Sequence, residues 1–125
     1  MIGIDAEARM IDLAKQYAGI DNWNNIELHE TSALNYITKC SAEFDCILID
    51  LFIEDVIPQE CISEPFINGL KSLLKPNALI LLNCLRNSTQ LKELEILLSK
   101  FPALTTKVHI INSDNLIIEI RSKAK

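Results

Sequence analysis

The stretch that decides the fold is FDCILIDLFIEDVIP, residues 44–58. Its first seven residues form an apolar run, which predicts a strand with two apolar faces, as is typical of the centre of a parallel sheet. The strand runs directly into three carboxylates, Asp50, Glu54 and Asp55. A phosphoacceptor pocket, a metal site or a pocket for a cationic substrate would each place that much negative charge at the end of a buried strand.

Short apolar runs alternate with helical periodicity on both sides of this stretch. The pattern predicts strands at residues 1–4, 26–30, 44–50, 78–85, 104–111 and 116–121, and helices at 6–18, from 31 or 32 through 37, at 63–74 and at 88–100. The last two strands are joined by the short loop NSDN, which favours an antiparallel hairpin. The order β-α-β-α-β-α-β-α-β-β predicts a doubly wound, mostly parallel, Rossmann-like α/β sheet with an antiparallel end.

Local chemistry marks several helix ends. Asp5 is expected to cap the helix that starts at Ala6, and Gly19 to end it. Asn77 is expected to adopt the left-handed turn that separates the third helix from the fourth strand.

Composition indicates one globular domain spanning residues 1–125, because 49% of the residues are apolar and 23% are charged. A net charge of −5 makes a nucleic acid an unexpected partner. The N-terminus lacks the pattern of a signal peptide and the longest apolar run is too short to span a bilayer, so we expect a cytoplasmic protein without a membrane partner. The four cysteines form no CxxC pair, and we expect reduced thiols and no metal site.

Five segments resemble the class I S-adenosylmethionine-dependent methyltransferase fold, within its spermidine-synthase-like branch. They are GIDAEARMIDLAKQY at 3–17, ELHETSALNYI at 27–37, FDCILIDLF at 44–52, LKPNALILLN at 74–83 and the closing hairpin. The resemblance extends over the whole of this chain. It matches only about the last two thirds of the family's fold, so we expect a partial domain.

The resemblance implies a set of site residues. Asp5 would accept hydrogen bonds from the ribose of S-adenosylmethionine or its decarboxylated form, and Ser32 and Ala33 would lie on the adenine side, although the residues themselves favour capping of the next helix as the role of Ser32. Asp50 would be the catalytic carboxylate that helps to deprotonate an attacking amine.

The acidic loop departs from the family pattern. The branch has a second aspartate three positions after the catalytic one, where this chain has Ile53. Glu54 and Asp55 would bind the amine substrate in its place, and a solvated acidic loop is the alternative.

The glycine-rich turn of the family has no match either, because the chain has three glycines and none lies close to another. We therefore expect a transferase domain that is incomplete and weakly active or inactive alone, whether it moves a methyl or an aminopropyl group.

Two other functions compete with this reading. A non-catalytic, degenerate domain could bind partners or form homo-oligomers through exposed sheet edges. A response-regulator receiver also has an acceptor aspartate after its third strand, like Asp50, but it requires a second acid beside Asp5 and a lysine after the fifth strand, and this chain has neither. The receiver is the more distant alternative.

Overall fold

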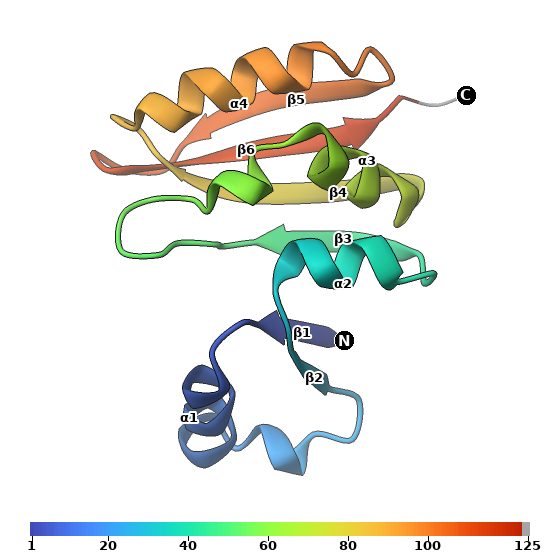
Figure 1. The fold of residues 1–125 in the computed structure, drawn as a ribbon, viewed down its shortest axis with the longest axis vertical. Coiled ribbons are helices and arrows are strands. Elements are labelled where there is room, and N and C mark those ends of the chain that lie inside the picture. The colour runs from blue at the N-terminus through green and yellow to red at the C-terminus, as the bar shows by residue number, and fades with distance from the viewer. Residues whose placement is uncertain (124–125) are drawn as a thin grey trace. The chain divides into compact units, whose positions relative to one another are not determined.

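The computed structural model describes residues 1–123 and divides the chain into two compact units, Met1–Lys39 and Cys40–Lys125 (Figure 1). The first unit contains β1 (Ile2–Asp5), α1 (Ala8–Ala18), the 3₁₀ helix η1 (Ile20–Asn22), β2 (Glu27–Glu30) and α2 (Ala33–Lys39). The second contains β3 (Phe44–Ile49), the 3₁₀ helix η2 (Gln59–Cys61), α3 (Glu64–Ser72), β4 (Leu74–Leu85), α4 (Thr89–Ser99), β5 (Leu104–Ile110) and β6 (Asn115–Ser122). The α/β order predicted from the sequence is confirmed; the prediction of a single domain stays a prediction.

In the first unit, β1 and β2 form a parallel pair, with Gly3 opposite Leu28. A Cβ at Gly3 would lie 2.7 Å from Leu28 Cδ2, so glycine permits this close packing. Helix α1 begins at Ala8 rather than at Ala6, because the Asp5 carboxylate accepts a hydrogen bond from the Glu7 backbone N–H at 2.8 Å and holds Ala6 and Glu7 in a turn. Gly19 ends the helix with φ of 62°, as predicted.

In the second unit, four strands form one sheet in the order β3-β4-β6-β5. Strand β3 is parallel to β4, while β6 is antiparallel to both β4 and β5. The last strand is therefore the one that runs opposite to its neighbours, and the predicted hairpin is confirmed. Asn77 has φ of 64°, also as predicted, although β4 already begins at Leu74.

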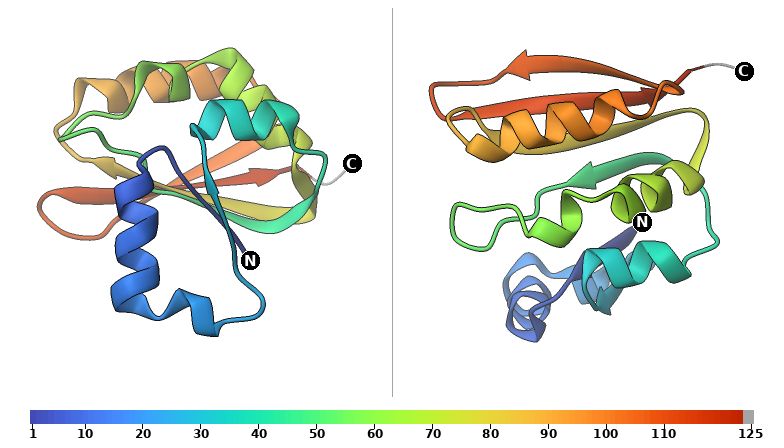
Figure 2. Two further views of the ribbon diagram at one scale, coloured as in Figure 1. Left: turned by 60° about the horizontal axis from the view of Figure 1, so that its bottom comes forward. Right: turned by 45° about the horizontal axis from the view of Figure 1, so that its top comes forward.

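The core of this unit lies between one face of the sheet and helices α3 and α4, which both cover that face (Figure 2). Alternate residues of β4 and β6 point into it, and α3 and α4 contribute further apolar side chains. The largest fully buried side chains are Phe66, Ile67, Ile80, Leu82, Leu94, Ile118, Ile120 and Cys84. Ser63 caps α3 by accepting from Phe66 N–H, and Ser88 caps α4 by accepting from Gln90 N–H.

The opposite face of the sheet is more open, and two predictions for β3 are wrong. Leu48 is 74% exposed and Cys46 is also exposed, so β3 is not buried on both faces. The strand lies at the edge of its sheet, because it pairs with β4 alone among the described residues. One neighbour leaves a row of backbone groups of β3 without a ladder partner.

The expected single sheet is also wrong, because the hydrogen bonds of residues 1–123 form two sheets, β1-β2 and β3-β4-β6-β5. Among these residues β1 and β3 do not pair directly with each other. No described helix is both long and apolar enough to cross a membrane.

Candidate functional site

Asp50 lies directly after β3, at its carboxyl end, which is where open parallel sheets place ligands and chemistry. Asn83 Nδ2 donates a hydrogen bond to Asp50 Oδ1 at 3.0 Å, and Asn115 Nδ2 donates to Asn83 Oδ1 at 3.1 Å. These three polar residues line an open cavity of about 410 Å³, the strand-end cavity, whose apolar wall contains Leu48 and Ile117. The second oxygen of Asp50 accepts no hydrogen bond from the described residues.

The acidic loop after Asp50 is a tight turn. Ile53 and Val56 exchange two backbone hydrogen bonds, of 2.9 and 3.1 Å, so that Glu54 and Asp55 form the tip between them. Glu54 has φ of 56°, a conformation that a residue with a side chain adopts at some cost. Both carboxylates are exposed, as are Ile53 and Val56.

Gln90 fixes the end of this loop to α4. Its Oε1 accepts from Ile57 N–H at 2.9 Å and its Nε2 donates to Ile57 O at 2.7 Å, so one side chain satisfies both backbone groups of a buried residue. Gln90 is the buried polar residue among the described ones, with 8% of its surface exposed. The exposed tip of the loop, Glu54 and Asp55, is thus followed closely by a residue, Ile57, whose backbone is held in place.

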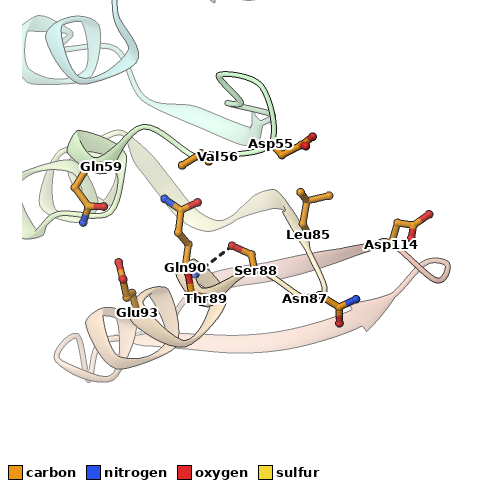
Figure 3. Close-up of a pocket in the computed structure, with 10 residues that line it drawn as sticks. All are labelled: Asp55, Val56, Gln59, Leu85, Asn87, Ser88, Thr89, Gln90, Glu93 and Asp114. Atoms are coloured by element: carbon orange, nitrogen blue, oxygen red, sulfur yellow. Dashed lines mark hydrogen bonds between the residues drawn. The ribbon is translucent and has the colours of Figure 1, made fainter.

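A second open cavity, of about 640 Å³, lies between the acidic loop, the start of α4 and the turn before β6 (Figure 3). We refer to it as the loop cavity. It is lined by Asp55, Val56, Gln59, Leu85, Asn87, Ser88, Thr89, Gln90, Glu93 and Asp114. Figure 3 shows Glu93 on α4 and Asp114 on the turn at opposite sides of the cavity.

The charge of the loop cavity favours a cation. Three of its lining residues are acidic and none is basic. The start of α4 opposes them with about half a positive charge from the helix dipole, which is small beside three carboxylates. No three His, Cys, Asp or Glu side chains of residues 1–123 come close enough to hold a metal ion. Separate carboxylates around one cavity suit a ligand that carries more than one ammonium group.

Asp5 and Ser32, which were expected to bind the nucleoside, make hydrogen bonds to backbone N–H groups within the first unit. Asp5 Oδ1 accepts from Glu7 N–H, while its second oxygen has no partner among the described residues. Ser32 Oγ accepts from Asn35 N–H at 3.1 Å and so caps α2, which Ala33 begins. Capping is the contact that the structure gives to Ser32.

The structure therefore divides the predicted residues among several places. Asp50 lines the strand-end cavity and Asp55 the loop cavity, while Glu54 lines neither. Asp5 lies in the first unit and Asp50 in the second.

Sequence reasoning missed Asn83, Gln90, Glu93, Asp114 and Asn115. A signal was available for Asn83, because an asparagine interrupts the apolar run ALILLNCL.

Comparison with known proteins gives a family and a fold. The family model for the spermine/spermidine synthase domain matches residues 1–103. No curated protein sequence gives a significant match.

Three solved structures illustrate the fold. Human methyltransferase-like protein 13, in complex with SAH, is 20% identical with a TM-score of 0.77, over 99% of this chain and 60% of that one. A spermidine synthase in complex with the transition state analogue AdoDATO is 19% identical with a TM-score of 0.77, over 98% of this chain and 46% of that one. A probable spermidine synthase from Corynebacterium glutamicum is 16% identical with a TM-score of 0.75, over 99% and 47%. The chain thus has the class I methyltransferase fold and spans about half the length of these proteins.

Proposed function

Because the chain belongs to the spermine/spermidine synthase domain family, we propose that it is the part of an aminopropyltransferase that carries the catalytic carboxylate and the amine pocket. The observation that carries this proposal is the position of Asp50, whose one oxygen is held by Asn83 while the other is open to a cavity. The loop cavity, with its three carboxylates, is proposed as the place of the amine substrate. The family match also argues against the phosphoacceptor alternative.

The chemistry assigned to this chain is a proton transfer. An amine nitrogen forms a bond to the carbon next to a sulfonium centre, the carbon–sulfur bond breaks, and a thioether leaves. The new ammonium must lose a proton, and the second oxygen of Asp50 accepts it. The carboxylates of Asp55, Glu93 and Asp114 hold the distal ammonium groups of the acceptor.

The residues of this chain supply only part of a binding site for the nucleoside that donates the transferred group. Asp5 has one carboxylate oxygen available for the ribose hydroxyls, while Ser32 is committed to its cap and no glycine-rich turn is present. Decarboxylated S-adenosylmethionine would supply the electrophilic carbon when bound, and S-adenosylmethionine would do so for methyl transfer. Two of three anchors, at about 1–3 kcal/mol each, are absent, so residues 1–125 alone should bind methylthioadenosine near millimolar rather than micromolar concentrations.

The test is an aminopropyl transfer assay on the full-length protein, with decarboxylated S-adenosylmethionine, a panel of diamines and detection of the product by mass. Asp50→Asn should abolish transfer without changing the fold, since an amide cannot accept the proton. Asp45→Asn is the matched control on the same strand, because Asp45 is exposed and pairs with Lys75 at the other end of β3. Equal turnover of Asp50→Asn and the wild type would remove Asp50 from the mechanism.

A non-catalytic assembly role is the second candidate. It is supported by the edge position of β3 and the exposed Leu48, since an open strand edge can pair with another chain. Light scattering at several protein concentrations would test for such a homo-oligomer. A cytoplasmic location is proposed as well, and the four free cysteines support it.

A further inference from the structure

We propose that Asn83 is a positioning residue for Asp50, and that Asn115 sets the direction in which the Asn83 amide points. The inference rests on the proposed function, since it assigns a role around the same carboxylate. It starts from the chain of hydrogen bonds Asn115 Nδ2 to Asn83 Oδ1, 3.1 Å, and Asn83 Nδ2 to Asp50 Oδ1, 3.0 Å.

The register of the sheet brings these residues together. Ile49 is opposite Leu82, so the next positions along the two parallel strands are Asp50 and Asn83. Asn83 is opposite Ile117 on β6, which makes Asn115 its diagonal neighbour two residues away on the same face. Strands β4 and β6 thus each supply one asparagine to the point where Asp50 follows β3.

Asparagine is a poor strand residue, and two of them on one face lower β propensity at a place where apolar side chains surround them. Leu48, Leu81 and Ile117 line the same cavity. A pair of asparagines here is explained by what their amides do for Asp50.

The direction of the chain matters because an amide has a donor end and an acceptor end. Asn115 donates to the oxygen of Asn83, and this contact turns the nitrogen of Asn83 toward Asp50. A reversed Asn83 would place its oxygen against the carboxylate, which is repulsive. With Oδ1 occupied by a donor, the carboxylate is held in one rotamer and its second oxygen is presented to the amine.

Steady-state kinetics of the full-length protein test this role, with Asn115→Asp as the decisive variant. An aspartate there cannot donate to Asn83, but it can accept from it, so Asn83 should reverse. We expect kcat to fall about 10- to 100-fold, the range for a lost hydrogen bond to a charged group, while KM for the amine changes less than about threefold. Asn115→Ser, which is neutral and too short to reach, should lower kcat in the same direction.

The matched control is Asn77→Asp, which adds the same charge near the other end of β4, where aspartate also tolerates the left-handed conformation. Its kcat should stay close to that of the wild type. A second readout does not depend on turnover: the side-chain amide signals of Asn83 in NMR spectra, identified by their loss in Asn83→Asp, should shift in Asn115→Asp and in Asp50→Ala, and stay in place in Asn77→Asp.

The outcomes separate the two proposals. Loss of kcat together with shifted amide signals supports the positioning role. An active wild type with equal kcat in Asn115→Asp and Asn77→Asp overturns that role and leaves the proposed function standing. A full-length wild type that transfers no aminopropyl group overturns the proposed function, and the role of Asn83 falls with it.

Discussion

Replacement of Gln90 by methionine should destabilise the second unit strongly, although methionine has nearly the same volume and suits a buried site. The change leaves Ile57 N–H and Ile57 O, both bonded to the Gln90 amide, without partners in a buried place. Each buried polar group without a partner costs about 1–3 kcal/mol, so the free energy of unfolding should fall by about 2–6 kcal/mol. That is a large part of the stability of a small domain.

The measurement is urea unfolding followed by far-UV circular dichroism, together with hydrogen exchange of the Ile57 amide. Circular dichroism is used because Trp23, the one tryptophan of the chain, belongs to the first unit. The control is Gln59→Met. Gln59 lines the loop cavity, as Gln90 does, but it is exposed and its side chain makes no hydrogen bond with the described residues. It should change stability by less than about 0.5 kcal/mol.

Gln90→Glu adds an intermediate case. The carboxylate keeps the bond from Ile57 N–H but loses the donor to Ile57 O and faces that carbonyl with a negative charge. At low pH this variant should regain part of the lost stability, because the protonated glutamate side chain is neutral and can donate to Ile57 O. If Gln90→Met and Gln59→Met unfold at the same urea concentration and Ile57 exchanges at the wild-type rate, the loop is held by something other than Gln90.

Three further changes test local physics. Hydrogen bonds from Arg121, and to a smaller extent from His109, lower the pKa of Glu119 below its ordinary value of 4.5. Ionised Glu119 therefore stabilises the fold above pH 4.5, and this contribution is lost as pH falls through the lowered pKa. Glu119→Gln should weaken the pH dependence of stability in acid unfolding curves, and unchanged curves would contradict this prediction. Burial, aided by Glu60, raises the pKa of Cys61 to about 11, so iodoacetamide at pH 8 should modify exposed Cys46 long before Cys61, as mass spectrometry can show. Asn77→Ala should cost about 1 kcal/mol in urea unfolding, because alanine is strained at φ of 64°, whereas Asn77→Gly should not.

The sequence predicted best what neighbouring residues decide. Gly19 and Asn77 adopt the left-handed conformations predicted for them, because such a turn depends on the residue itself and on its immediate neighbours. The start of α1 is an exception among these local features: the Asp5 carboxylate accepts a hydrogen bond from Glu7 N–H, and the helix begins two residues later than predicted.

The position of β3 could not be predicted from its own residues. An apolar run with two apolar faces is typical of a covered, central strand, yet pairing depends on which strands the rest of the chain supplies. Here β3 has β4 as its neighbour and Leu48 stays 74% exposed. The apolar composition of a strand shows that both of its faces favour burial. Whether they are buried depends on which other strands and helices are present to cover them.

The site residues that were missed act across long separations. Gln90 bonds to a residue 33 positions away, and Asn115 to one 32 positions away. On a helix, Gln90 fits the polar side of an amphipathic pattern as well as it fits a buried anchor. Only the fold shows that Ile57 approaches its amide.

The acidic stretch 50–55 holds three carboxylates with three different surroundings. Asp50 is bonded to Asn83 and lies at the strand end, Glu54 occupies a strained turn position, and Asp55 lines the loop cavity. A general acidic patch would make the three interchangeable, whereas different surroundings are what the proposed division between proton transfer and substrate binding requires.

In the transfer assay, Asp55→Asn should therefore raise KM for a diamine by about 3- to 30-fold and leave kcat nearly unchanged, because one lost charge contact is worth about 0.6–2 kcal/mol. Glu54→Gln should change neither, and Glu54→Gly should relieve the positive φ and stabilise the turn. An Asp55→Asn enzyme that loses kcat with an unchanged KM would place Asp55 beside the reacting nitrogen, and the amine would then bind in the opposite direction.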